Sequence, residues 1–218
     1  MPNPIEQYWN IKLEKVKEKL ENNNFEAHIV DNAEEAHRLV MGKILTKYEN
    51  ATVSFGGSMS VVGAGVYEAL KKSGQPYNII DTFDHTLPDE KKWELRRQAL
   101  LSDVFITGTN ALTEDGTLVN LDAFGNRVAA LAFGPHNVVV IVGRNKVVAD
   151  ESEAIARIKD YAAPVNNIRL GRKTPCTKTA SCHDCNSPDR ICNVWTINEK
   201  SFPAGRIKVI LVNDDLGF

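Results

Sequence analysis

Short apolar segments alternate with amphipathic segments between residues 25 and 162, and this alternation constrains the fold more than any other feature of the sequence. The clearest apolar segment is VVVIV at residues 138–142, which offers no polar position to solvent on either face. A strand of this kind must be covered on both sides, as strands in parallel sheets are. Strands that alternate with helices predict an α/β fold, with a mainly parallel sheet flanked by helices.

The spacing of apolar residues also places the elements. Helices are expected over residues 4–21, 32–48, 90–101 and 151–162. Another helix is expected to follow the glycine turn at residues 56–58 and to run through residues 67–72. Strands are expected over residues 25–30, 52–55, 77–80, 103–107, 118–121, 138–142 and 206–212, and the segment 127–133 continues the alternation. Asn32 is the expected cap of the second helix, and Pro164 is expected to close the last one.

The chain has 218 residues, of which 43% are apolar, so it is long enough for a large domain with a small appendage. We expect an α/β domain with an N-terminal helix over residues 1–165, and a Cys-rich extension with a C-terminal strand over residues 166–218. The formal net charge of -2 comes from well-mixed acids and bases, which gives no electrostatic reason to expect nucleic acid or an anionic membrane as partner. A small anionic metabolite or a partner protein fits this balance better.

The first 20 residues carry many charged side chains, including Glu6, Lys12 and Glu14, so they lack the apolar core of a secretion signal. No other apolar run is long enough to span a bilayer. We therefore expect a cytoplasmic protein without membrane insertion, in a compartment where thiols stay reduced.

Two polar loops follow predicted strands, and in parallel sheets ligands bind outside the carboxyl ends of the strands. This rule predicts one cleft formed by residues 56–60 and 108–127, although a glycine turn between a strand and a helix is often a plain connection. Asp115 and Gly116 could equally form a hairpin turn. The candidate ligand-binding residues are Gly56, Gly57, Ser58, Gly108, Thr109, Asn110, Asp115, Asn120 and Arg127.

All four cysteines fall within one short segment, Cys176, Cys182, Cys185 and Cys192, with the spacing C-x5-C-x2-C-x6-C. Thiolates crowded in this way need a cation to offset their repulsion, and four of them complete the ligand set of a zinc ion or of an iron-sulfur cluster. A 4Fe-4S cluster is favoured because the paired C-x2-C knuckles of zinc ribbons are missing. The alternatives are a structural zinc site and, in an oxidising compartment, two disulfides.

Residues 106–143 carry a Gly-Thr turn, an arginine after a glycine, and an apolar strand preceded by Pro-His. In this pattern the chain resembles the LUD-domain family, the lactate-utilisation family that includes the LutC-like proteins, over roughly residues 30–150. The Cys-bearing segment resembles a subset found in anaerobes. The resemblance implies a role in oxidation of lactate or a related organic acid, as an iron-sulfur subunit or accessory that meets a redox partner protein or other oxidase subunits.

The same stretch is similar, more distantly, to the fold shared by ribose-5-phosphate isomerase, glucosamine-6-phosphate deaminase and the CoA transferases. Asn110 stands where the isomerase branch keeps its catalytic aspartate, and an amide cannot act as a general base. A stand-alone enzyme on a sugar phosphate or CoA-type substrate, with a structural zinc site, is therefore an alternative that would need Glu114 or Asp122 as its base. A metabolite-sensing or scaffold module is a third possibility. Whether this chain catalyses a reaction stays open at this stage.

Overall fold

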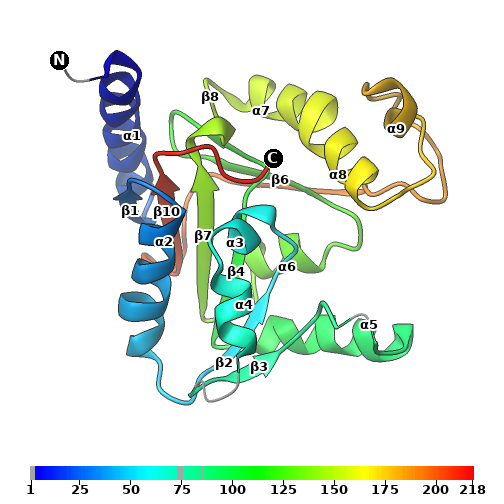
Figure 1. Cartoon of the computed structure of the whole chain (residues 1–218), viewed down its shortest axis with the longest axis horizontal. Coiled ribbons are helices and arrows are strands. Elements are labelled where there is room, and N and C mark those ends of the chain that lie inside the picture. The colour runs from blue at the N-terminus through cyan, green and yellow to red at the C-terminus, as the bar shows by residue number, and fades with distance from the viewer. Residues whose placement is uncertain (1–2, 73–75, 85) are drawn as a thin grey trace.

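A six-stranded, fully parallel sheet forms the centre of the computed structural model, which describes residues 3–72, 76–84 and 86–218 (Figure 1). Each neighbouring pair of strands runs in the same direction. The strands, in their order across the sheet, are β1 (Glu26–Val30), β10 (Ile207–Val212), β7 (Asn137–Gly143), β4 (Val104–Gly108), β2 (Thr52–Phe55) and β3 (Asn78–Ile80). The predicted α/β class with a parallel sheet is confirmed.

The central strand β7 explains why the sheet is covered on both faces. Val139 and Ile141 pack into a core on one face, whereas Val138, Val140 and Val142 pack into a second core on the other. All five side chains are at most 1% exposed. The unbroken apolar run therefore follows from burial on both sides.

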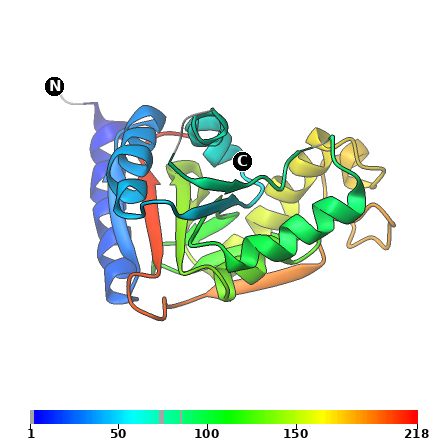
Figure 2. The same cartoon turned by 90° about the horizontal axis from the view of Figure 1, so that it is seen from below.

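Helices cover both faces, as the alternation predicts (Figure 2). The face that bears Val139 is covered by α2 (Ala33–Leu39), the π turn η1 (Val40–Ile44), α3 (Met59–Gly63) and α4 (Val66–Lys71). The face that bears Val138 is covered by α1 (Pro4–Asn22) and α6 (Asn126–Ala132). The remaining helical elements are η2 (Leu45–Lys47), α5 (Asp89–Gln98), η3 (Ala99–Leu101), η4 (Arg144–Lys146), α7 (Glu151–Arg157), η5 (Ile158–Ala162), α8 (Ala163–Arg169) and α9 (Cys176–Thr179).

Local capping fixes where several helices begin. The Asn32 side chain accepts a hydrogen bond of 3.0 Å from the Glu35 amide, as expected for a cap. The hydroxyl of Ser58 accepts from the Val61 amide at 3.3 Å and starts α3 directly after the glycine loop. Gly65, at φ 67°, then divides the single helix expected here into α3 and α4, because left-handed backbone ends an α-helix.

A second, four-stranded sheet lies beside the first, and most of its strands were not predicted from the sequence. Its order is β8 (Val147–Val148), β5 (Ala111–Thr113), β6 (Leu118–Asp122) and β9 (Val194–Asn198), with β6 antiparallel to both of its neighbours. The helix α7 covers this sheet, and Ala154 and Ile158 pack there against Val119 and Leu121. Only β6 was expected, because β5 and β8 are three and two residues long.

The helix predicted over residues 151–162 does not end at Pro164, and this expectation is corrected. Through η5 the chain continues into α8, where Pro164 occupies the first turn. Proline is tolerated there because the first amides of a helix have no intrahelical acceptor. The cysteine segment contains the single-turn helix α9.

The C-terminal strand β10 lies inside the main sheet, between β1 and β7. The division at residue 165 stays a prediction about chain organisation, but the sheet takes strands from both sides of it. Figures 1 and 2 place the cysteine segment at one end of the molecule and α1 and α2 at the other. Within the described residues, no helix combines the length and apolarity that a bilayer crossing requires.

Truncating Ile210 in β10 tests whether the C-terminal strand belongs to the cooperative core. Ile210 is fully buried, so Ile210→Ala should lower the free energy of unfolding by about 2–5 kcal/mol. Ile5→Ala on α1 is the matched control, because Ile5 is 62% exposed and its loss should cost within about 0.5 kcal/mol. Urea unfolding followed by circular dichroism measures both. An unchanged midpoint for Ile210→Ala would show that β10 is dispensable for the core.

Candidate functional site

A cleft of about 870 Å³ opens where β2, β4 and β7 end, at the carboxyl edge of the main sheet. The helix α5 contributes Trp93 and Arg96 to one wall, and α8 contributes Asn166 and Arg169 to another. Of the residues proposed from the sequence, the cleft brings together Gly57, Ser58, Gly108, Thr109, Asn110, Asp122 and Arg127. The strand-end rule therefore locates the cleft, and the binding role of these residues stays a prediction.

The glycines of the two loops allow close packing. A Cβ atom on Gly56 would lie 2.7 Å from both Arg127 Cγ and Thr107 Oγ1, so any side chain there would displace the loop. A Cβ atom on Gly108 would collide with the hydroxyl of Ser58. Gly56 itself lies behind the lining of the cleft. Its role is to let the β2 loop approach the arginine beneath it.

Arg127 forms the floor of the cleft, and its terminal donors are already used. Nη1 donates to Asn120 Oδ1 at 2.6 Å and to the carbonyl of Gly108 at 3.3 Å. Nη2 donates to Asn110 Oδ1 at 2.8 Å and to the carbonyl of Leu121 at 2.9 Å. A guanidinium has four N–H bonds on these two nitrogens, so none is left for a bidentate pair with a ligand. Arg127 therefore acts as a brace between strand ends.

Asp122 balances the buried charge of Arg127. Its Oδ1 lies 3.6 Å from Arg127 Nε, and its Oδ2 accepts from the amides of Gly125 at 3.0 Å and Arg127 at 3.3 Å. Burial lowers the pKa of Arg127, and the carboxylate of Asp122 opposes that shift. A carboxylate held by three partners is poorly placed to take a proton from a ligand.

Glu114 and Asp115, both proposed from the sequence, lie outside the cleft lining. They occupy the turn between β5 and β6, which packs against α1. Glu114 Oε1 pairs with Lys12 Nζ at 2.7 Å, and this contact raises the pKa of Lys12. The carbonyl of Asp115 accepts from Asn23 at 2.9 Å, and its carboxylate bonds to the Thr113 hydroxyl. Sequence proximity to Asn110 was misleading because the hairpin carries its tip away from the strand ends.

Lys146 is one of the cleft residues that sequence reasoning missed, and it is the most deeply buried lysine among them. It lies in η4, directly after β7, and is only 3% exposed. Its Nζ donates to Ser60 Oγ at 2.9 Å and to the carbonyl of Thr109 at 3.3 Å. Burial, together with the nearby cations Arg157 and Arg127, lowers its pKa to about 7 from an ordinary 10.5. The strand-end rule, applied to the strand 138–142, would have pointed to it.

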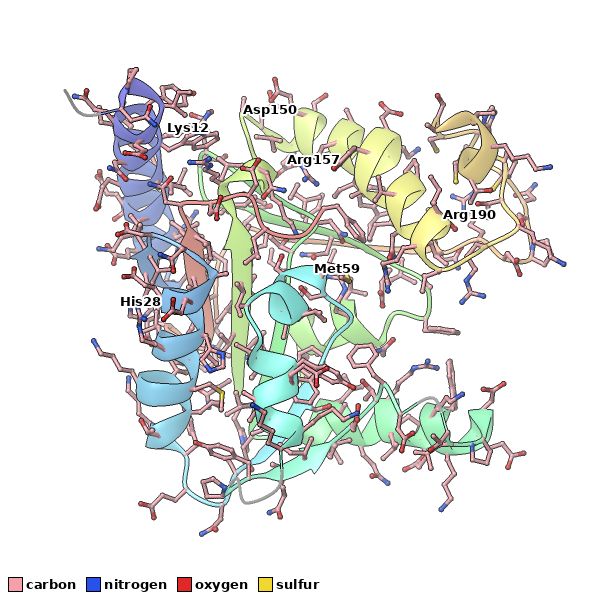
Figure 3. The ribbon with its side chains drawn as sticks, in the orientation of Figure 1. Lys12, His28, Met59, Asp150, Arg157 and Arg190 are labelled. Carbon is pink, nitrogen blue, oxygen red and sulfur yellow. The ribbon has the colours of Figure 1, made fainter. Side chains whose placement is uncertain are left out.

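Figure 3 labels Arg157 on α7 and Met59 at the start of α3, the second of which lines the cleft. Arg157 donates to the carbonyls of Asn110 at 2.7 Å and Asn145 at 3.2 Å, so it fixes the loops on either side of Lys146. Apart from Lys146, the cleft lining has five cations and three acids, a surplus of two positive charges: Lys92, Arg96, Arg127, Arg169 and Arg172 against Asp89, Glu90 and Asp122. Such a surface suits an anion.

A second cavity, of about 120 Å³, is lined by all four cysteines together with His183 and Trp195. Three residues line both cavities, so they form a common wall: Leu121, Ala163 and Ile191. Among the residues with described placement, no three His, Cys, Asp or Glu side chains converge closely enough to hold a metal ion. The metal role of the cysteines therefore stays a prediction, but the fold turns all four toward one space.

Arg190 organises the cysteine segment, and Figure 3 shows it beside α9. Its guanidinium donates to the carbonyl of Cys185 at 2.6 Å, to the carbonyl of Cys192 at 2.9 Å, and to Asp184 Oδ1 at 2.9 Å. The Asp184 amide donates to Cys182 Sγ at 3.4 Å. Arg190 thus crosslinks the backbone of the segment.

Comparison with known proteins adds the family. A family model described as LUD domain matches residues 13–212. The chain belongs to the LUD-domain family. The match extends beyond the 30–150 range in which the residues suggested it, and it includes the cysteine segment within its bounds. The wider likeness to sugar-phosphate isomerases and CoA transferases stays a prediction.

A solved structure supports the fold of this LUD domain. The crystal structure of a DUF162 family protein from Deinococcus radiodurans aligns with a TM-score of 0.52 and 15% sequence identity, over 94% of this chain and 98% of that one. At this identity the likeness concerns the fold. The search of curated proteins gave no match.

Replacing Lys146 by methionine tests whether the fold lowers the pKa of this amine. The lowered pKa means that the unfolded chain binds more protons than the folded chain between pH 7 and 10.5, so wild-type stability gains from rising pH there, by at most about 1.4 kcal/mol per unit. Lys146→Met should therefore have a higher free energy of unfolding than wild type at pH 7. This difference in free energy should become smaller towards pH 9. Urea unfolding at both pH values measures this difference.

Lys12→Met is the control for that experiment. The pKa of Lys12 is raised by Glu114, so its contribution is stabilising and fully present below pH 10.5. This variant should be less stable than wild type by the same amount at pH 7 and pH 9. If the stability difference between Lys146→Met and wild type is also the same at pH 7 and pH 9, then Lys146 keeps its charge in the folded protein.

Proposed function

We propose that this LUD-domain protein binds a small organic acid, such as lactate or a related hydroxy acid, in the strand-end cleft. We further propose that the four cysteines hold a 4Fe-4S cluster and that the chain serves in oxidation of that acid, with a redox partner protein. The observation that carries the proposal is the common wall of Leu121, Ala163 and Ile191. An anion site and a four-thiol cavity share it, so a ligand and a redox centre would be neighbours.

The composition of the smaller cavity supports a cluster, because all four cysteines line it. Four thiols are the usual ligands of a 4Fe-4S centre, which would supply one-electron transfer when bound. The cavity of about 120 Å³ is roughly ten times the smallest space that holds a water molecule, so it offers more room than one zinc ion fills. The Thr174 hydroxyl lies 3.2 Å from Cys176 Sγ, and the Asp184 amide donates to Cys182 Sγ. Hydrogen bonds to ligand sulfurs tune such centres.

Some cations of the cleft lining are paired with acidic side chains, whereas others are left for an anionic ligand. Lys92 pairs with Asp89 at 3.3 Å, and Arg127 pairs with Asp122. Arg172 differs, because its Nε is buried and, within the described part of the chain, has no hydrogen-bond acceptor. A buried donor without a partner costs about 1–3 kcal/mol. A ligand carboxylate would supply the missing acceptor.

The alternative of a stand-alone isomerase or transferase finds less support. It needs a general base in the cleft, and of the two carboxylates nominated for it Glu114 lies outside the lining while Asp122 is held by three partners. The proposal therefore assigns this chain the tasks of binding the acid, orienting it beside the common wall and holding the redox centre.

Metal analysis tests the cysteine part of the proposal. Protein purified without oxygen should contain about four irons per chain and absorb broadly near 400 nm. Cys185→Ser should lose this iron while the far-ultraviolet circular dichroism is kept, because Cys185 lies outside both sheets. His183→Ala is the control that should retain it, since this ring bonds to Thr179 at 2.8 Å. One zinc per chain, or no metal, would contradict the cluster.

Calorimetry with lactate tests the cleft. Arg172→Ala should weaken lactate binding by about 10-fold or more, because a hydrogen bond to a charged group is worth about 1.5–3 kcal/mol. Arg97→Ala is the matched control: Arg97 is exposed on α5, pairs with Glu94 and does not line the cleft. Equal affinities of both variants and wild type would place the acid elsewhere.

A further inference from the structure

A neutral amine satisfies every hydrogen bond that Lys146 makes. The Ser60 hydroxyl donates its own hydrogen to the carbonyl of Leu216 at 3.0 Å, so towards Lys146 it can only accept. The carbonyl of Thr109 is also an acceptor. Both contacts therefore consume N–H bonds of Lys146. An ammonium would carry a third N–H that has no acceptor among the described residues, whereas an amine has only two and keeps a lone pair.

The amine of Lys146 is buried among cations at the wall of the cleft. Lys146 lines the cleft, and the backbone of Gly217 packs closely on its other side, where a Cβ atom would lie 3.2 Å from Nζ. In the part of the chain that the structure describes, no carboxylate pairs with it. The charged groups that act on it are Arg157 from α7 and Arg127 from α6, and both disfavour its protonation. A buried lysine of this kind is a nucleophile for carbonyl carbons.

We propose that Lys146 forms an imine with the carbonyl carbon of a 2-oxo acid bound in the cleft. This inference rests on the proposed function, because a 2-oxo acid is the product of oxidising a 2-hydroxy acid. The Nζ lone pair attacks the carbonyl carbon, a C–N bond forms, and the carbonyl oxygen leaves as water with the two amine hydrogens. The step needs no oxidant or reductant. A proton from solvent converts the imine to its protonated form, and the carboxylate of the same ligand offsets the positive charge.

The low pKa makes this step possible near neutral pH. With a pKa of about 7, a large fraction of Lys146 is unprotonated at pH 7.5. For an ordinary lysine, on the order of one molecule in a thousand is unprotonated at that pH. The reaction should therefore select Lys146 over the other lysines of the chain.

Reductive trapping with pyruvate tests the inference. The full-length protein is incubated with pyruvate and sodium borohydride at pH 7.5, where hydride reduces an imine to a stable secondary amine. Intact mass should show one adduct per chain, and peptide mapping should place it on Lys146. Lactate is the matched ligand, with a hydroxyl in place of the keto group, and it should give no adduct. Lys208 is an internal control in the same digest: it is 4% exposed but lies in β10, outside the cleft, and should stay unmodified.

Lys146→Met supplies the second arm, since replacing a buried amine by an apolar side chain of similar length should keep the fold. It should form no adduct. Adducts spread over many lysines and unchanged in this variant would overturn the inference. Pyruvate that binds by calorimetry but is never trapped would also overturn it and leave the proposed function standing. If neither lactate nor pyruvate binds, the proposed function fails, and the inference with it.

Discussion

The buried guanidinium of Arg127 is the interaction on which the rest of the site depends. It joins the end of β4, through the carbonyl of Gly108, to Asn110, Asn120 and the carbonyl of Leu121, and so links the main sheet to the second sheet. Removing one partner from a buried ion pair costs about 3–5 kcal/mol, because the other charge is left uncompensated. The brace is therefore rigid, and the cleft floor above it is fixed before any ligand arrives.

The position of Arg127 also explains why glycine is needed at residues 56 and 108. The β2 loop can reach the arginine only because Gly56 has no side chain, and Ser58 can pack on the β4 loop only because Gly108 has none. The glycine–serine loop looks in the sequence like an anion-binding turn, yet its clearest structural role is close approach. The hydroxyl of Ser58 is used to cap α3. A motif can thus mark the right place for a site while its residues mainly shape the walls.

The sequence predicts the parts of the fold in which one periodic pattern decides the outcome. The run at residues 138–142 indicated a strand covered on both faces, and Asn32 before an amphipathic segment indicated a helix start. The second sheet could not be predicted in the same way, because β9 pairs with β6 across about seventy intervening residues and has no apolar run of its own. Pro164 misled for a related reason: a π turn before it lets the chain enter a new helix, and nothing local signals that turn.

The candidate site shows the same division between local pattern and long-range contact. The strand-end rule places the cleft, whereas the charge state of Lys146 depends on burial under the segment that carries Gly217 and on cations from α6 and α7. The segment between Arg169 and Cys176 connects the two cavities directly, with Arg172 on the cleft and Cys176 on the thiol cavity. One short stretch of backbone therefore lines both cavities, and any effect of occupancy at one cavity on the other would pass through it. Thermodynamic linkage makes that effect reciprocal.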